Sequence, residues 1–467
     1  MNFTPVQASD SATWLPAAGP RSRWLLVIGC AILHVLSFPP VGWRWLIIPS
    51  LIGLLHVLQN VTSTEARRYG FFYGLIAHGI SLCWFCNLFG AFSLALFGLL
   101  ALFMAIFCWM YASVQRNHAA PSMLGLMTAG AWVTVEFFRS EHFWLCFSWA
   151  TPGLAIGPNP VLPWIGVYGV SFLIVLACAW LMKKSTTVAG VLILGAVAFG
   201  SWQWQHGLAP LTAKNPIRVA AVQHENVDFN TYLESSEALP KNIQLVVWPE
   251  LALPYDLYTN KHDWDLLHKF VDDRHAVMVV GTMTDADKPS EWRNTALTFD
   301  EVGRLGEHYK NHVVHFMNEG KPGTKAEAVT TQLGVVGTPI CFDNDFEDVP
   351  RRMTMDGAQF FASPVMDVEN WSALQHEQHA ELFRIRAAEN ARWYVVAATS
   401  GVTQIVDSMG RVRSRLDTMT SGVLTGEVGR QTELTFYTRF GWLFPWIISG
   451  LYLVITVNLW IRRVNVL

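Results

Sequence analysis

The 467-residue sequence predicts two kinds of structure in one chain: a membrane α-helical bundle of about eight spans and a layered α/β domain. Hydrophobic residues make up 52% of the chain and charged residues only 15%, which is too apolar for an ordinary soluble protein. The apolar residues are concentrated, since only three acidic residues occur between Trp24 and His206. From about residue 207 to 436 the chain instead alternates short β-rich runs with helical patterns.

The apolar segments define the predicted membrane spans, because a spanning helix needs about 20 mostly apolar residues. Eight segments are candidates: 24–39, 43–59, 69–89, 91–113, 122–139, 161–182, 186–205 and 440–461. The polar start of the chain lacks the features of a signal peptide, so we do not expect the first span to be cleaved. The predicted parts are an N-terminal cytoplasmic tail (1–23), a seven-span domain (24–206), the α/β domain (207–436) and a final span (437–467).

The positions of Arg and Lys predict the orientation of these spans, because positive charge is retained on the cytoplasmic side. All five basic clusters fall on one side if the N-terminus is cytoplasmic: Arg21 and Arg23, Arg67 and Arg68, Arg116, Lys183 and Lys184, Arg462 and Arg463. The α/β domain lies between spans seven and eight, so we expect it outside the cytoplasm, in the periplasm of a Gram-negative bacterium. The net charge of −3, without a basic patch interleaved with aromatics, argues against a nucleic-acid partner.

Within the α/β domain, apolar and β-branched runs predict strands and amphipathic spacing predicts helices. The predicted strands are 217–223, 243–250, 276–282, 294–300, 333–342, 358–365, 393–400 and 403–410. The predicted helices are 262–274 and 374–392. Several strands are almost continuously apolar, as expected for sheets covered on both faces.

Three chemically complementary side chains occur at or near strand ends. Glu250 ends "VVWPE", Cys341 ends "TPIC", and Lys310 lies between them in "EHYKNHVVHF". A carboxylate can take the thiol proton, an ammonium can stabilise an oxyanion, and the thiolate can attack a carbonyl carbon. Cys341 is the only cysteine of the domain. Singly, the three residues are more often a strand cap, a solvated lysine and a packed cysteine, so it is their ordered set that indicates a site.

These motifs resemble those of a known family. "VVWPELALP", "YKNHVVHF" and "ICFDNDF" are similar to the Glu, Lys and Cys motifs of the nitrilase (carbon–nitrogen hydrolase) superfamily. Membrane spans on both sides narrow the resemblance to the apolipoprotein N-acyltransferase family, and it extends into the membrane part through "LSFPPVGWRWLIIPSLIGL" and "WVTVEFFRS". The resemblance implies an αββα sandwich.

The resemblance also implies roles for the three residues. Glu250 would be the general base, Lys310 and the backbone N–H of Phe342 would stabilise the oxyanion, and Cys341 would carry a thioester-linked acyl group. The acyl donor would be a membrane phospholipid, and the acceptor the N-terminal amine of a diacylglyceryl-cysteine lipoprotein. No cofactor or metal is implied.

Two positions depart from the family pattern. The family usually has a second Glu eight residues after the Lys, whereas here Asn318 holds that position and Glu319 follows it as the candidate. The family usually has an aromatic-Glu pair after the Cys, and here it is Phe342-Asp343. The segment from Lys310 to Cys341 is also shorter than is usual in this family, as it is in soluble nitrilases and in conjugal-transfer membrane proteins of the same architecture.

These departures leave three functions open. The first is a phospholipid-dependent N-acyltransferase. The second is a membrane-tethered carbon–nitrogen hydrolase or acyltransferase with another substrate, serving conjugal transfer or envelope assembly. The third is an inactive scaffold that keeps the fold, which the intact set of Glu250, Lys310 and Cys341 disfavours.

Further residues are candidates for substrate binding. Trp149 resembles the aromatic of a family loop near the cleft, although an interfacial Trp is an equally good interpretation. Trp371 and His379 lie in a segment that resembles the family's substrate-side loop and helix. His379 has no acidic or thiol partner at ligand spacing, so we expect no metal there. We also expect Lys310 to favour the Cys341 thiolate and speed alkylation at neutral pH.

Overall fold

The computed structural model describes residues 18–116, 120–207, 215–286, 288 and 291–464. Most of the predicted N-terminal tail (1–23) and the start of the predicted α/β domain (208–214) therefore lie outside the described residues. The chain forms two compact units, and each is described by itself. The helical unit comprises Met1–Ile156, Val167–Gly200 and Leu443–Leu467, and the α/β unit comprises Gly157–Gly166 and Ser201–Trp442.

Helices occupy every segment predicted to span the membrane. They are α1 (Pro20–Leu36), α2 (Ile47–Val57), α3 (Ser63–Ser81), α4 (Phe85–Phe89), α5 (Ser93–Gln115), α6 (Pro121–Phe137), α8 (Leu162–Leu181), α9 (Thr187–Trp202) and α15 (Phe444–Val464). A short helix, α7 (Pro152–Ile156), lies between two predicted spans. Among the described residues, four helical stretches are long and apolar enough to cross a membrane: Phe85–Gln115, Leu162–Leu181, Thr187–Gly207 and Gly441–Ile461. The others are shorter or more polar; α3, for example, starts at a Thr62–Glu65 capping box.

Two six-stranded mixed sheets form the core of the α/β unit. The first has the order β12-β1-β2-β3-β4-β5 and the second β11-β10-β9-β8-β7-β6. The strands of the first sheet are β1 (Ile217–Gln223), β2 (Leu245–Val247), β3 (Val277–Asp285), β4 (Trp292–Asp300), β5 (Gly303–Tyr309) and β12 (Gly422–Val428). Those of the second are β6 (Val329–Thr331), β7 (Gly334–Gly337), β8 (Phe360–Val365), β9 (Trp393–Ala398), β10 (Gln404–Val406) and β11 (Val412–Arg415).

Each sheet has three parallel strands at its centre, namely β1-β2-β3 in the first and β7-β8-β9 in the second. Successive residues of the first sheet alternate between two apolar cores. Val219, Leu245 and Val277 face the second sheet, whereas Ala220 and Val246 face the helices. Both faces are therefore buried, which explains the continuous apolar runs in the sequence.

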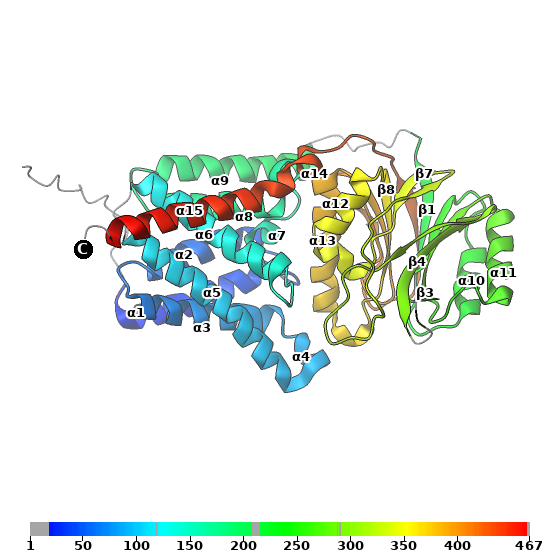
Figure 1. Ribbon diagram of the computed structural model, residues 1–467, viewed down its shortest axis with the longest axis horizontal. Coiled ribbons are helices and arrows are strands. Elements are labelled where there is room, and N and C mark those ends of the chain that lie inside the picture. The colour runs from blue at the N-terminus through cyan, green and yellow to red at the C-terminus, as the bar shows by residue number, and fades with distance from the viewer. Residues whose placement is uncertain (1–17, 117–119, 208–214, 287, 289–290, 465–467) are drawn as a thin grey trace, which may run out of the picture. The chain divides into compact units, whose positions relative to one another are not determined.

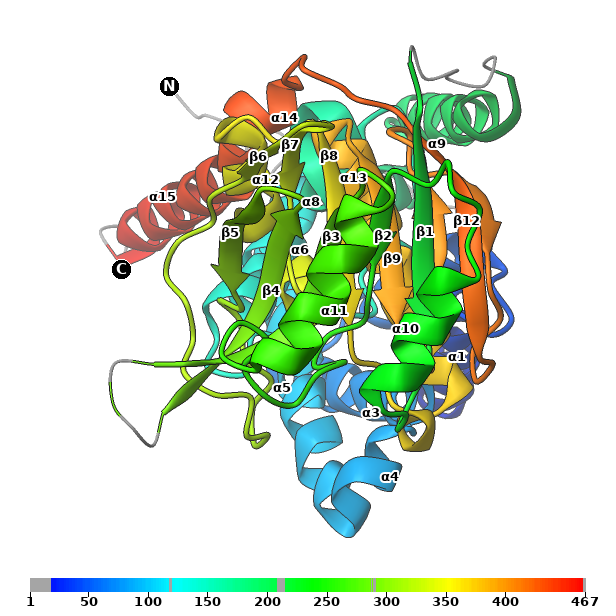
Figure 2. The ribbon, with the colours of Figure 1, turned by 90° about the vertical axis from the view of Figure 1, so that its right-hand side faces the viewer.

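Four helices cover the outer faces of this sandwich: α10 (Phe229–Glu237), α11 (Lys261–Asp272), α12 (Asp348–Met355) and α13 (Ala373–Asn390). Helices α10 and α11 lie against the first sheet, and α12 and α13 against the second (Figures 1 and 2). A short helix, α14 (Phe436–Arg439), follows β12. The predicted layered α/β domain is thus an αββα sandwich.

Some elements differ from the sequence prediction. β2 ends at Val247 and β7 at Gly337, so Glu250 and Cys341 each lie a few residues beyond a strand end. Pro249 and Pro339 explain the early ends, because proline has no N–H to donate to a ladder. Four strands and two helices were not predicted: β5, β6, β11, β12, α10 and α12. The missed strands carry polar, partly exposed residues, as in "GRLGEHY" of β5, so their hydrophobic pattern is weak.

Candidate active site

Glu250 is buried beyond the end of β2 and is held by three groups. Its Oε1 accepts hydrogen bonds from Asn294 Nδ2 at 2.6 Å and from Lys310 Nζ at 2.8 Å. Its Oε2 accepts the backbone N–H of Met366 at 2.8 Å. Gly281 on the next strand permits this position, since a Cβ there would lie 2.1 Å from the carbonyl oxygen of Pro249.

Lys310 follows β5 directly and its ammonium lies between two carboxylates. Nζ is 2.8 Å from Glu250 Oε1 and 2.9 Å from Glu319 Oε1. The other oxygen of Glu319 accepts the backbone N–H of Val314 at 2.7 Å, which fixes the loop after Lys310. Asn318, at the position where the family usually has Glu, is exposed, whereas Glu319 is buried. Glu319 therefore reaches the site despite the shift of one residue.

Cys341 begins a short 3-10 helix, η5 (Cys341–Asp345), and is 3% exposed. Its φ is +43°, a left-handed conformation that is unfavourable for a non-glycine residue. Asn344 Nδ2 donates to the Cys341 carbonyl at 3.0 Å and so braces this turn. Phe342 follows in the first turn of η5, where backbone N–H groups have no partner within the helix. Its ring packs edge-on against Phe346.

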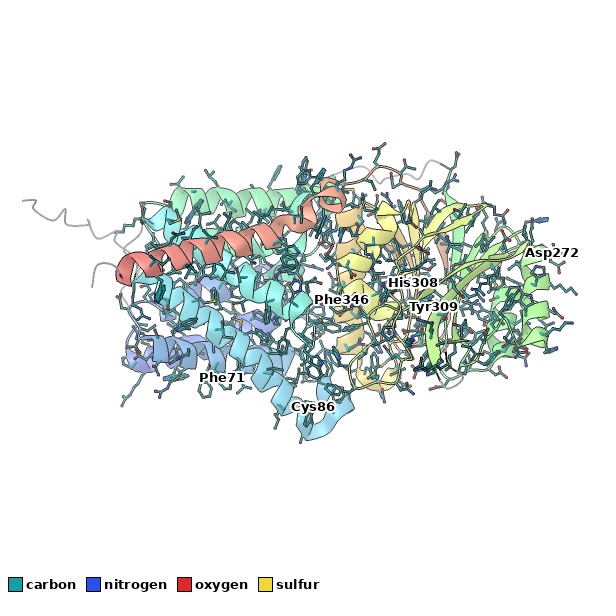
Figure 3. All side chains as sticks on the ribbon, in the orientation of Figure 1. Phe71, Cys86, Asp272, His308, Tyr309 and Phe346 are labelled. Carbon is teal, nitrogen blue, oxygen red and sulfur yellow. The ribbon has the colours of Figure 1, made fainter. Side chains whose placement is uncertain are left out.

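Asp343 links the cysteine turn to the lysine segment. Its Oδ1 accepts the backbone N–H groups of Asn311 and His312 at 2.9 and 2.8 Å. Its Oδ2 accepts the N–H of Ile340 at 3.0 Å and lies 2.9 Å from Nε2 of His308. Figure 3 shows His308 among the strands of the α/β unit, whereas Asp272 lies at its outer helical side. The Asp343 carboxylate thus spans the residues beside both Lys310 and Cys341.

His379, on α13, lies on another side of Cys341 with two carboxylates that the sequence did not indicate. Its Nδ1 is 2.9 Å from Asp367 Oδ2 and its Nε2 is 3.2 Å from Asp345 Oδ1. Ligand-type atoms of Cys341, Asp367 and His379 all lie within 4.8 Å of one another. Sequence spacing indicated no acidic or thiol partner for His379, whereas the structure brings Asp345, Asp367 and Cys341 to it from other elements. Its partners come from the turns after β7 and β8, which sequence spacing does not relate to α13.

Charge determines the resting protonation of these groups. Burial raises the pKa of Glu250, although Lys310 opposes the shift. Burial alone would lower the pKa of Lys310, but Glu250 and Glu319 outweigh it and hold that pKa well above its usual range. The pKa of the Cys341 thiol is also raised well above its ordinary value, first by burial and then by Glu250. Cys341 therefore rests as a thiol, although Lys310 acts toward the thiolate as expected. The faster alkylation expected from the sequence stays a prediction.

The donor set of Cys341, Asp367 and His379 is one that could hold a zinc-type ion. The protonation of His379 opposes this use. Burial alone would lower its pKa, but Asp367 and Asp345 raise it to about 10. Both ring nitrogens then carry protons that face carboxylates, so a metal would have to displace one of these protons.

The two tryptophans predicted to bind substrate lie in different units. Trp371 is buried in the short helix η6 (Glu369–Trp371), four residues after Asp367. Trp149 is buried in the helical unit, where its ring centroid is 5.3 Å from that of Trp84 and its carbonyl accepts a hydrogen bond from Arg139. Residues that sequence reasoning missed are Asn294, Asp345 and Asp367.

Comparison with known proteins agrees with this two-part organisation. Residues 30–180 match the family model of the apolipoprotein N-acyltransferase N-terminal domain, and residues 218–434 match the carbon-nitrogen hydrolase model. An apolipoprotein N-acyltransferase of Geobacter metallireducens is 26% identical, with 91% of this chain and 93% of the relative covered. One of Pseudomonas aeruginosa is 25% identical, with coverages of 92% and 94%. The chain belongs to the apolipoprotein N-acyltransferase family.

Solved structures that are similar to this family member include one from yeast. A nitrilase-superfamily protein of Saccharomyces cerevisiae matches with a TM-score of 0.40 and 20% identity, covering 46% of this chain and 90% of that one. The Geobacter and Pseudomonas apolipoprotein N-acyltransferases align with nearly the full chain. Both domains of the family, membrane helices and carbon–nitrogen hydrolase domain, are therefore present together in this protein.

Proposed function

We propose that the protein is a phospholipid-dependent N-acyltransferase that transfers a fatty acyl group through Cys341 to the N-terminal amine of a diacylglyceryl-cysteine lipoprotein. The observation that carries the proposal is the buried convergence of Glu250, Lys310 and Cys341. The full-length relatives are named apolipoprotein N-acyltransferases, which supports the choice of a lipoprotein amine as acceptor.

The first half-reaction would acylate Cys341. Glu250 takes the thiol proton, and the sulfur attacks the ester carbonyl carbon of the phospholipid. The ammonium of Lys310 has three donors, of which two go to Glu250 and Glu319, so one remains for the oxyanion beside the N–H of Phe342. The C–O bond then breaks, and the lysophospholipid oxygen leaves with the proton from Glu250.

The second half-reaction would release the acyl group. The acceptor amine attacks the thioester carbonyl, the C–S bond breaks, and the sulfur takes up a proton to restore the thiol. The products are an amide and the free Cys341. Asp343 and Glu319 act as positioning residues, because they hold the backbone N–H groups of Asn311, His312 and Val314, which follow Lys310.

We further propose that the helical unit provides eight spans with a cytoplasmic N-terminus, which would put the α/β unit outside the cytoplasm of a bacterium. The five basic clusters on one side of the membrane support this orientation. A membrane-impermeant thiol reagent should label Asp272→Cys in spheroplasts, whereas Ser185→Cys should be labelled only after lysis. The reverse pattern would exclude the orientation.

Intact-protein mass spectrometry tests the function. The full-length protein in detergent, incubated with phosphatidylethanolamine and phosphatidylglycerol, should gain one fatty-acyl mass that a diacylated lipopeptide removes. Cys341→Ala should gain none, and Cys86→Ala, a change at an exposed cysteine, should behave like the parent. No adduct from either phospholipid would overturn the proposal. An adduct that the lipopeptide never discharges would instead favour a membrane-tethered hydrolase or acyltransferase with another substrate.

A further inference from the structure

The proposed mechanism leaves one buried charged cluster beside Cys341 without a role. This acceptor-side cluster consists of Asp345, Asp367 and His379. The side chains are 0–3% exposed, and the imidazole lies 3.2 Å from one carboxylate and 2.9 Å from the other. Gln375 Nε2 also donates to Asp367 Oδ1 at 3.0 Å.

The acceptor-side cluster contains two carboxyl groups and one imidazole. Although burial alone would raise the pKa of Asp367, His379 outweighs it and lowers that pKa. His379 is protonated, so two carboxylates face one imidazolium. A buried negative charge needs a cationic partner or several hydrogen bonds to be stable. Because Asp367 lies beside both His379 and Cys341, its carboxylate can also contact a cation held next to the thioester.

Asp367 is rigidly placed for such a contact. Its backbone carbonyl accepts hydrogen bonds from the Ser400 N–H at 3.0 Å and from Thr399 Oγ1 at 2.9 Å. Gly401 lies against its carboxylate, since a Cβ there would be 2.6 Å from Oδ2. The preceding residue, Met366, holds Glu250 through its N–H. The Glu250 carboxylate is thus hydrogen-bonded to Met366, and Asp367 is the next residue of the same turn. The turn therefore fixes the positions of both carboxylates.

Aminolysis of a thioester has a proton requirement that one carboxylate does not meet. An α-amino group has a pKa of about 7.7–8.0, so the acceptor arrives mostly as an ammonium. The balanced step is R–NH3⁺ plus the Cys341 thioester giving the amide, the Cys341 thiol and one H⁺. The amine thus loses two protons, of which the sulfur receives one. The site must hold the ammonium beside the thioester and accept the other proton.

We propose that Asp367, oriented by His379 and Asp345, is the binding site for the primary ammonium group of the acyl acceptor. The Asp367 carboxylate holds the ammonium nitrogen next to the thioester carbon, accepts one of its protons and releases it to water. Glu250, ionised after the first half-reaction, takes the other proton from the attacking nitrogen and passes it to the departing sulfur. This inference rests on the proposed function and assigns its acceptor a recognition site. It selects a cationic amine over water, which would only hydrolyse the acyl-enzyme.

The test measures the second half-reaction alone. Cys341 of the full-length protein in detergent is acylated with p-nitrophenyl decanoate, which supplies the acyl group without phospholipid. Discharge is then followed by mass spectrometry with a diacylglyceryl-cysteine dipeptide, an ammonium at neutral pH, and with hydroxylamine, which is uncharged. In Asp367→Asn we expect the KM for the dipeptide to rise about tenfold or more, because a charge-assisted hydrogen bond is lost. The discharge by hydroxylamine should stay within about twofold of the parent.

A second variant keeps the test decisive if Asp367→Asn does not fold. Gly401→Ala retains the charge but crowds Oδ2, and it should raise the KM for the dipeptide in the same selective way. The control is Asp348→Asn, which removes a carboxylate that pairs with His312 at a partly exposed site. This variant should leave the discharge by the dipeptide and by hydroxylamine unchanged. Equal slowing of dipeptide and hydroxylamine, or no change with either, would overturn the ammonium site. Acylation by the activated ester but not by phospholipid would overturn the proposed donor instead, and acylation by neither would overturn the thioester mechanism as a whole.

Discussion

The carboxylate of Asp343 accepts the backbone N–H of His312 at 2.8 Å, which joins the turn that begins with Cys341 to the segment that begins with Lys310. The same side chain accepts the N–H of Ile340, immediately before the cysteine. A shorter side chain than the Glu of related proteins therefore bridges the two segments. Burial alone would raise the pKa of Asp343, but hydrogen bonding from His308 and nearby histidine charge lower it, so the carboxylate is ionised at neutral pH.

Replacing Asp343 with Asn should weaken both the fold and the first half-reaction. The amide offers one acceptor and one donor, so either a backbone N–H or His308 loses its partner in a buried place. We expect a loss of about 2–4 kcal/mol in the free energy of unfolding and a marked fall in the rate of thioester formation. Thermal unfolding and adduct formation measure the two effects. Asp356→Asn is the control, because Asp356 also accepts a backbone N–H, from Ala328, but at an exposed site. Similar losses in both variants would contradict the bridging role.

Changing Glu250 to Gln should lower the pKa of the Cys341 thiol while abolishing acyl transfer. The negative charge of Glu250 raises the pKa of the Cys341 thiol, and the positive charge of Lys310 lowers it. With a neutral Gln at position 250, the effect of Lys310 is no longer opposed by this carboxylate. The pH dependence of iodoacetamide alkylation, followed at Cys341 by peptide mass spectrometry, gives the midpoint. We expect the parent midpoint to lie above the ordinary thiol value and the Glu250→Gln midpoint to lie below the parent's. A midpoint that does not move would show that burial alone sets the thiol pKa.

The sequence predicted the site to the extent that its residues follow apolar strands. Glu250 and Cys341 come after strongly hydrophobic runs, so their positions beyond strand ends could be inferred from the pattern. Lys310 follows β5, whose polar residues give no such pattern, so it was indicated only by its complementary chemistry, its place in the chain between Glu250 and Cys341, and the family motif. The contacts of His379 could not be predicted, because Asp345 and Asp367 reach it from turns after β7 and β8. Which turns reach a given helix depends on the order of the strands in the sheet, and the hydrophobic pattern of the sequence does not specify that order.

Glu319 should matter more than Asn318, although related proteins usually carry the glutamate at the position of Asn318. A hydrogen bond to a charged group contributes about 1.5–3 kcal/mol, so losing the Glu319 charge beside Lys310 should slow thioester formation about 10- to 100-fold. Glu319→Gln keeps an oxygen for the Val314 N–H and thereby isolates the charge effect. Asn318→Ala changes an exposed side chain and should leave the rate within about twofold. If Asn318→Ala slowed thioester formation and Glu319→Gln did not, Asn318 rather than Glu319 would be the residue that supports Lys310.

The clamp of Asp345 and Asp367 on His379 should make part of the protein's stability depend on pH. The pKa of His379 is raised from 6.5 to about 10 in the folded protein. A raised pKa stabilises the fold fully below pH 6.5, and this contribution declines as the pH rises toward 10. Asp367, whose pKa is lowered, stabilises the fold above its ordinary titration range and loses that contribution in acid.

The unfolding temperature of the full-length protein in detergent should therefore exceed that of His379→Gln most at mildly acidic pH, and the difference should shrink toward pH 10. The control is His275→Gln, because His275 pairs with Glu301 at an exposed site where solvent screens the charges. A difference between parent and His379→Gln that stays constant over this pH range would mean that the imidazole acts by packing rather than by its charge.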